Sequence, residues 1–279
     1  MAYKLVALDI DGTICGPDLK LSDRLLAAVE KAQESGAVVT LATGRMLRSA
    51  MRFAKALGTS GPVVCYQGAI VADPVSGQVL RHERLQPCVA RAALSIIDNG
   101  GSHINVYLED HIYVADRNEW AVGYASRMEL DLMVVDDLAP LADSRPTLVM
   151  AVDEPERVKA IAEEISSYFD GQAMVTHSIP RFCEVASPDA GKARALEFVT
   201  SRLRIKSSEV VAFGDGAGDV DMLEWAGLGV AVGDPHHSAL EASDARVAGP
   251  DRDGVAVFLE DMLDRGLLGG EGGGTTSRE

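Results

Sequence analysis

The stretch Lys4–Thr13, KLVALDIDGT, decides the fold of this chain. Its first part is a short apolar run of β-prone residues, which predicts a buried strand over Lys4–Ile10. Asp9 and Asp11 lie two residues apart at the end of that strand, so both carboxylates are expected to face one crevice. Gly12 permits a sharp exit and a close approach of the backbone to a ligand. The pattern D-x-D-G-T arises by chance in roughly 0.3% of chains this long, which disfavours a plain loop of solvated acids.

The segments that follow alternate between strand and helix. Such tandem alternation indicates a parallel sheet that is covered on both faces. Elements of this type are expected at residues 23–35, 37–42, 47–57 and 63–66 and, later in the chain, at 193–204, 209–213, 220–226, 228–232 and 255–263. The predicted fold class is therefore α/β, with a doubly wound, mostly parallel, Rossmann-like core sheet.

The middle of the chain has a different rhythm. Between residues 83 and 186, short strand-like runs and hairpins mix with helices, which is typical of an α+β insertion. We therefore predict a discontinuous core from residues 1–82 and 187–266, interrupted by an inserted domain over 83–186. The Gly-rich stretch at 267–279, LLGGEGGGTTSRE, is expected to be a disordered tail.

Two short motifs are candidates for phosphate binding. Thr43-Gly44-Arg45 follows the second predicted strand and begins a helix, where free backbone N–H groups and the helix dipole favour an anion. Three residues are a weak match, and an N-cap role for Thr43 is the alternative. Lys192 begins a later helix, where the dipole opposes a positive charge, so this position favours a functional explanation over a plain surface lysine.

A second acidic cluster, Gly214–Asp219 (GDGAGD), follows the strand predicted at 209–213. Aspartates that crowd one crevice repel each other unless a cation compensates them. Hard oxygen ligands without a nearby His or Cys suit Mg²⁺ better than Zn²⁺. A Mg²⁺ ion held by Asp9, Asp215 and Asp219 would relieve the repulsion and would also neutralise an incoming phosphate. An ordinary acidic turn is the alternative.

The composition argues against several classes of partner. A formal net charge of −16 over 279 residues disfavours nucleic acid and anionic membranes, because both bind basic surfaces. The chain has no apolar stretch of about 18 residues, so no membrane span is expected. Its four cysteines show no C-x-x-C pair and read as reduced thiols. We predict a cytoplasmic protein.

In their order along the chain, the four motifs resemble those of the haloacid dehalogenase (HAD) superfamily. Phosphatases of that superfamily carry D-x-D-x-T, a Ser/Thr motif, a Lys motif and a terminal acidic motif. The resemblance covers nearly the whole chain except the tail. The long insertion between the second and third motifs looks like a Cof-type (class IIB) cap, an α+β lid over the active site.

The resemblance implies a role for each motif residue. Asp9 would be the nucleophile and a metal ligand, and Asp11 the general acid/base that also lends a backbone carbonyl to the metal. The implied phosphate-binding residues are Thr43, Gly44 and Lys192, and the implied metal ligands are Asp9, Asp11, Asp215 and Asp219. Two positions depart from the family pattern. Gly218 stands where an Asn usually precedes the final acid, and Gln67-Gly68-Ala69 stands where N-G-A is common.

The predicted function is Mg²⁺-dependent hydrolysis of a small phosphate monoester, such as a sugar phosphate or a phosphoglycolate-like acid, through a phosphoaspartate on Asp9. A phosphomutase of the same superfamily and a phosphoaspartate signalling or binding protein without turnover are the alternatives. A response-regulator receiver fits less well, because its phosphoacceptor lies on a later strand than its acid pair. Arg145, His177 and Arg181 are candidate cap contacts with substrate, although ordinary surface roles are favoured. Neither the substrate nor the oligomeric state is predicted.

Overall fold

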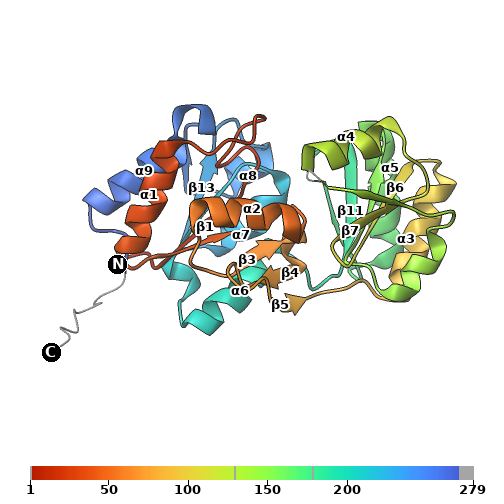
Figure 1. Ribbon diagram of the computed structural model, residues 1–279, viewed down its shortest axis with the longest axis horizontal. Helices are drawn as coiled ribbons and strands as arrows, with labels where there is room; N and C mark the ends of the chain where they lie inside the picture. The colour runs from red at the N-terminus through yellow and green to blue at the C-terminus, as the bar shows by residue number, and fades with distance from the viewer. Residues whose placement is uncertain (1, 129, 178, 270–279) are drawn as a thin grey trace.

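The computed structural model describes residues 2–128, 130–177 and 179–269, which form two lobes (Figure 1). The chain crosses between the lobes twice, over residues 83–86 and 187–191. The first lobe holds the two ends of the described chain, and the second lobe holds its middle. The division of the chain into folding units at residues 82–83 and 186–187 remains a prediction.

The first lobe is built on a five-stranded parallel sheet of order β14-β13-β12-β1-β2. Its strands are β1 (Leu5–Leu8), β2 (Val38–Leu41), β12 (Val210–Gly214), β13 (Leu228–Val232) and β14 (Ala245–Val247). Its helices are α1 (Asp23–Glu34), α2 (Leu47–Leu57), α6 (Lys192–Leu203), α7 (Val220–Trp225), α8 (His237–Glu241) and α9 (Gly254–Asp264). This architecture confirms the predicted α/β fold class.

The side chains of β1 alternate between two cores, as a strand covered on both faces requires. Val6 and Leu8 belong to a cluster that includes apolar residues of α1, α2 and α9. Leu5 and Ala7 belong to a second cluster with apolar residues of α6, α7 and α8. All four side chains are fully buried, so β1 is packed on both faces at the centre of the lobe and positions the residues that follow it.

Helix α1 begins where the sequence predicts. The hydroxyl oxygen of Ser22 accepts the N–H of Leu25 at 3.1 Å, which satisfies one of the unpaired donors of the first turn. Residues Leu25, Ala28, Val29 and Ala32 recur at helical spacing and are the buried face of the helix.

The third predicted strand does not extend the parallel ladder as expected. Strand β3 (Val63–Cys65) pairs antiparallel with β4 (Ile70–Ala72), and β4 pairs with β5 (Val79–His82). A single parallel bridge, Ala42 to Val64, joins this three-stranded sheet to the end of β2. The hairpin after residue 65 supplies antiparallel partners that strand alternation alone did not indicate.

The second lobe packs helices against one face of a six-stranded sheet of order β10-β11-β9-β6-β7-β8. All its strand pairs are antiparallel except β7 with β8. Its strands are β6 (His103–Leu108), β7 (His111–Val114), β8 (Leu132–Val134), β9 (Leu148–Val152), β10 (Met174–Thr176) and β11 (Phe182–Ala186), and its helices are α3 (Pro87–Asn99), α4 (Glu119–Met128) and α5 (Pro155–Phe169). Apolar residues of α3 and α5 cover the sheet, and α4 lies at the end of this lobe that faces the first (Figure 1).

The remaining differences from expectation are short elements. Helix α8 has five residues and the edge strand β14 has three, and neither is long enough to show a periodic pattern. The first residues of the stretch expected as a tail are bound to the N-terminal segment. The carbonyl of Leu267 accepts the N–H of Tyr3, and the N–H of Gly269 donates to the carbonyl of Tyr3. Residues 270–279 lie outside the described residues. Within the described ranges, no helix combines the length and apolarity needed to cross a bilayer.

Candidate active site

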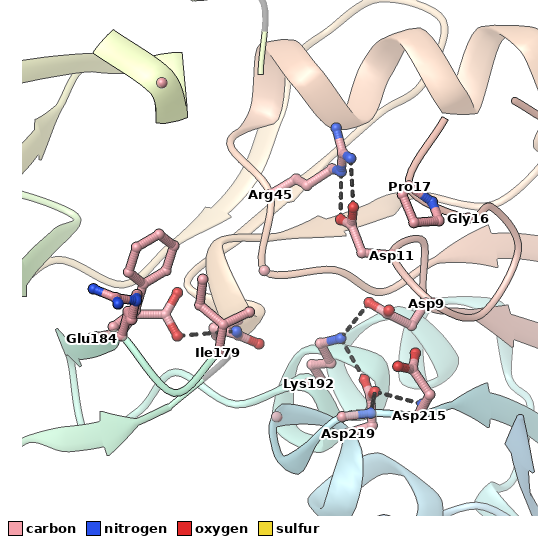
Figure 2. A pocket seen from close by; sticks show the side chains of 18 of the residues that line it. Asp9, Asp11, Gly16, Pro17, Arg45, Ile179, Glu184, Lys192, Asp215 and Asp219 are labelled. Carbon is pink, nitrogen blue, oxygen red and sulfur yellow. Dashed lines mark hydrogen bonds and ion pairs between the residues drawn. The ribbon is translucent and has the colours of Figure 1, made fainter. Parts of the chain in front are cut away.

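The end of β1 places Asp9 and Asp11 on the wall of one pocket. The backbone N–H of Asp9 donates to the carbonyl of Phe213 at 3.0 Å, which continues the parallel ladder by one residue. Beyond this point the chain turns at Gly12, whose φ is +82°. The carboxylate of Asp9 points toward Lys192, whereas that of Asp11 turns the other way (Figure 2).

Three carboxylates from distant parts of the chain converge at this edge of the sheet. Asp9, Asp215 and Asp219 each offer an oxygen, and these oxygens lie within 4.8 Å of one another. The hydroxyl of Thr13 donates to Asp215 Oδ1 at 2.6 Å. Asp219 Oδ2 accepts the backbone N–H groups of Asp215 at 3.0 Å and of Gly216 at 2.8 Å. The loop after β12 therefore orients its own two acids.

Gly12 is required by this convergence. A Cβ at residue 12 would collide with the carboxylate of Asp215, and the positive φ is in addition unfavourable for other residues. The Gly following the D-x-D pair thus brings the first acidic loop against the second.

Lys192 is the positive charge at the centre of the cluster. Its Nζ donates to Asp9 Oδ1 at 2.7 Å and to Asp219 Oδ1 at 2.5 Å, and its side chain is only 3% exposed. Lys192 is the first residue of α6, where the helix dipole is unfavourable for a cation. The carboxylate of Asp221 accepts the N–H of Ala193 at 3.0 Å and so places a compensating negative charge at the same helix terminus.

Burial and charge crowding shift the pKa values of these groups. Burial raises the pKa of Asp9 well above its ordinary value, against the opposing charge of Lys192, and the Asp219 and Asp215 carboxylates raise it further. Burial likewise raises the pKa of Asp215 to about 6. Burial alone would lower the pKa of Lys192, but the adjacent Asp219 and Asp9 outweigh it and raise that pKa. One lysine does not neutralise three carboxylates, so the cluster as it stands carries excess negative charge.

The Thr43–Arg45 segment lies beside the cluster at the start of α2. Gly44 lines the pocket. Thr43 is buried, and its hydroxyl oxygen accepts the backbone N–H of Arg45 at 3.2 Å. This contact is a local turn and not a helix cap, because α2 begins at Leu47 with Met46 as its N-cap residue. The N-cap role that was the alternative to phosphate binding is therefore wrong.

Arg45 is a site residue to which the sequence assigned no role. Its Nε and Nη2 each donate to Asp11 at 2.6 Å, one to each carboxylate oxygen (Figure 2). The guanidinium is buried; it also donates to Ser49 and lies 4.7 Å from the ring centroid of Phe53. Arg45 belongs to the T-G-R motif, which was the available sequence signal for this residue. A buried arginine needs a carboxylate partner, and Asp11 is the one it pairs with in a bidentate geometry.

The pocket continues from these residues to the second lobe and has a volume of about 770 Å³. The second lobe contributes seven lining residues: Glu119, Trp120, Gly123, Ile179, Arg181, Phe182 and Glu184. The guanidinium of Arg181 lies 4.4 Å from the Trp120 ring centroid and donates to Glu154 at 2.6 Å. Of the three candidate contacts expected in this lobe, Arg181 lines the pocket, and Arg145 and His177 are not among the lining residues.

A family model for haloacid dehalogenase-like hydrolases matches residues 6–259 of the chain. The protein belongs to this family. The predicted superfamily is therefore confirmed, as is the prediction that the chain is a hydrolase of that superfamily.

Individual relatives of this haloacid dehalogenase-like hydrolase align over almost its full length. The 5-amino-6-(5-phospho-D-ribitylamino)uracil phosphatase YitU of Bacillus subtilis is 28% identical over 266 residues, which are 93% of this chain and 97% of the relative. The crystal structure of TM0651 from Thermotoga maritima has 31% identity and a TM-score of 0.79, covering 93% of this chain and 97% of that one. The HAD subclass IIB sugar phosphatase BT4131 has a TM-score of 0.80 at 20% identity, covering 95% of this chain and 100% of that one, and shares the fold.

The haloacid dehalogenase-like hydrolase has a donor set that fits a divalent cation. Three carboxylate oxygens lie within 4.8 Å of one another. Burial, with added repulsion from the neighbouring carboxylates, raises the pKa values of Asp9 and Asp215, so a bound cation would favour their ionised forms. The set is all oxygen, which suits a hard cation. The carboxylate of Asp11 is not part of this group, because it is turned to Arg45.

Proposed function

We propose that this protein is a Mg²⁺-dependent phosphatase that hydrolyses a small-molecule phosphate monoester through a phosphoaspartate on Asp9. The observation that supports this most strongly is the position of Lys192, whose ammonium bridges Asp9 and Asp219 at the base of the pocket. A phosphate placed there would meet a nucleophilic carboxylate and a fixed positive charge together. Asp9, Asp215 and Asp219, with the backbone carbonyl of Asp11, are the proposed metal ligands.

In the first step a carboxylate oxygen of Asp9 attacks phosphorus, and the bond from phosphorus to the ester oxygen breaks. Asp11 is the proposed acid that protonates the departing alcohol oxygen. Both Asp11 oxygens accept hydrogen bonds from Arg45, so this role requires the carboxyl group to loosen that ion pair when it carries the proton. A bound Mg²⁺ would supply charge neutralisation for the phosphoryl oxygens.

In the second step water attacks the phosphoaspartate, Asp11 accepts the proton of that water, and inorganic phosphate leaves with Asp9 restored. Thr43, Gly44 and Lys192 are the proposed phosphate-binding residues. Acid–base help typically contributes ~10²–10⁴ in rate, whereas enzymatic accelerations for phosphate monoesters approach ~10²¹. Most of the barrier must therefore be lowered by positioning, by fixed charge and by the covalent intermediate.

The second lobe, residues 83–186, is the proposed cap that selects the substrate. A volume of about 770 Å³ is in the usual range for sites that enclose a small molecule, which is about 300–1,000 Å³. The expected substrate is a small phosphorylated metabolite. Because the proposed phosphate-binding residues Thr43, Gly44 and Lys192 all lie in the first lobe, the seven lining residues of the cap are expected to contact the leaving group.

Release of inorganic phosphate from a panel of phosphate esters, with Mg²⁺ or with a chelator, tests this function. Asp9→Asn should lower turnover by at least about 10³-fold, as loss of a nucleophile does in other covalent enzymes, while the circular dichroism spectrum is unchanged. Asp18→Asn is the matched control, because Asp18 is an exposed acid in the same loop. Wild-type turnover by Asp9→Asn would show that the nucleophile is misassigned.

The same assay separates the alternatives. A phosphomutase would move the phosphoryl group to another hydroxyl of the substrate and release no phosphate. A signalling or binding protein would be phosphorylated once and would not turn over. Repeated release of inorganic phosphate that depends on Mg²⁺ is expected only from the phosphatase.

A further inference from the structure

The turn Tyr66–Gly68 places one side chain, that of Gln67, at the boundary between the two lobes. Its backbone N–H donates to the carbonyl of Thr43 at 3.2 Å, and its carbonyl accepts the N–H of Gly191 at 2.9 Å. Gln67 has the left-handed conformation, with φ +53° and ψ +31°. These contacts tie Gln67 to the segments that carry Thr43 and Lys192, and its buried side chain lines the pocket.

Two glycines provide the space for this side chain. A Cβ at residue 44 would lie 2.5 Å from Gln67 Nε2, which no real contact allows. A Cβ at residue 218 would lie 3.0 Å from Gln67 Oε1 and 3.3 Å from Nε2. The Gln67 amide therefore occupies a slot between Gly44 and Gly218, and a larger residue at either position would have to displace it.

The orientation of the Gln67 amide follows from its contact with the second lobe. Nε2 donates to Glu184 Oε2 at 3.3 Å, and the hydroxyl of Thr176 donates to the same oxygen at 3.1 Å. A flipped amide would set an oxygen against the carboxylate, with no proton between them. The amide oxygen Oε1 therefore faces away from Glu184, where it is buried and has no hydrogen-bond partner among the described residues.

A buried amide oxygen without a hydrogen-bond donor is unfavourable, so this position favours a ligand that supplies a donor. The contact that orients the amide joins the two lobes, so a separation of the lobes would expose Oε1 to an entering substrate. Gln67 lies between the segments that carry Thr43 and Lys192 and the second lobe, so the part of a bound substrate beyond the phosphate would lie against it.

We propose that Gln67, oriented by Glu184, is a specificity residue whose Oε1 accepts a hydrogen bond from a hydroxyl group on the leaving group of the substrate. This inference rests on the proposed phosphatase function. Gln67 would favour hydroxylated leaving groups over leaving groups without a hydrogen-bond donor, because only a hydroxyl group can donate to its amide oxygen.

The test compares kcat/KM for hexose phosphates, for their singly deoxygenated analogues and for phenyl phosphate, whose leaving group has no second hydroxyl. Wild type should prefer one hydroxylated ester over the matching deoxy analogue. In Gln67→Met that preference should fall by at least about fivefold, which is the factor expected from one hydrogen bond. Equal losses on the two esters would mean that Gln67 only supports the fold, and an unchanged preference would also overturn the proposal.

A swap keeps the test decisive if Gln67→Met misfolds. Gln67→Glu should lose the preference, because two carboxylates then face each other. Adding Glu184→Gln restores one donor between the two side chains and leaves an acceptor facing the pocket, so the double variant should regain at least about fivefold of the preference. No recovery in a folded double variant would contradict the role given to Gln67.

Gln33→Met is the matched control. Gln33 lies in α1, away from the pocket, and its Oε1 is also buried and unpaired among the described residues. The same substitution there should leave the substrate preference unchanged, and a change of equal size would refute the inference. A wild type that cleaves phenyl phosphate with Mg²⁺ but shows no preference for any hydroxyl defeats this inference alone. A wild type that cleaves no ester defeats the proposed function as well.

Discussion

Replacing Asp215 with Asn should make the protein more stable without metal and less responsive to Mg²⁺. Asp215 is largely buried beside two other carboxylates, and its pKa is raised from 3.8 to about 6. Ionising such a group in the folded protein costs about 3 kcal/mol relative to the unfolded chain. Asn keeps the shape and can still accept the hydroxyl of Thr13, but it carries no charge.

The sign of the pH dependence follows from the direction of this shift. Between the unfolded pKa near 4 and the folded pKa near 6, the folded protein binds the proton more tightly, so stability falls as the pH rises through this window. When the pH is lowered from about 8 to about 5, protonation of Asp215 alone should raise the free energy of unfolding by about 1.4 kcal/mol. Its contribution becomes nearly complete only below about pH 3, about one unit under the unfolded pKa.

The assay is denaturant unfolding followed by tryptophan fluorescence, at about pH 5 and about pH 8, with chelator or with Mg²⁺. In chelator at pH 8, Asp215→Asn should be more stable than wild type by about 1–3 kcal/mol, and its change between the two pH values should be smaller by about 1 kcal/mol. Mg²⁺ at a hundred times its dissociation constant should stabilise wild type by about 2.7 kcal/mol and the variant by much less.

Asp143→Asn is the control for a change of one charge, because Asp143 is an exposed acid in the second lobe that pairs with Arg91. It should leave both the pH dependence and the Mg²⁺ effect as in wild type. Equal stabilisation of wild type and Asp215→Asn by Mg²⁺ would refute the assignment of Asp215 as a ligand. Lower stability of the variant in chelator at pH 8 would refute the argument from charge crowding.

Three further predictions follow from individual contacts. Asp11→Asn should slow turnover by about 10²-fold or more and let a phosphoenzyme accumulate, as seen by mass spectrometry, because the proposed acid and base is lost; an unaltered rate would count against that role. Gly12→Ala should destabilise the protein by at least about 1–2 kcal/mol, since it adds left-handed strain and a collision with Asp215, and thermal unfolding with and without Mg²⁺ measures both effects. Asp110→Ala should lower the free energy of unfolding in denaturant by about 1–3 kcal/mol. The Asp110 carboxylate accepts the hydroxyl of Tyr66 at 2.9 Å and the N–H of Arg48 at 3.0 Å, which join the two lobes. A loss below about 0.5 kcal/mol would show that this contact between the lobes is weak.

Local sequence patterns were sufficient to predict most of the helices and strands. The helix over 47–57 was predicted with its final bounds, and the helix after Ser22 with its cap, because apolar spacing and capping chemistry act within a few residues. The sequence was less informative at β3, whose partners depend on a hairpin that follows it, and at the short α8 and β14. These three elements are stabilised by neighbouring parts of the fold that cover them, and such tertiary contacts cannot be read from the local sequence.

The candidate site divides in the same way. The sequence by itself determined which residue types gather, since parallel strands end at one edge of a sheet and the acids, Thr43 and Lys192 all follow such strands or begin the helices beside them. Only the tertiary structure decided the partners: Lys192 with Asp9 across 183 positions, Asp11 with Arg45, and Gln67 with Glu184 across 117 positions. The physical reason is that a carboxylate pairs with whichever donor the packed chain brings within about 3 Å. Residues so far apart in the sequence meet only when the whole core has packed.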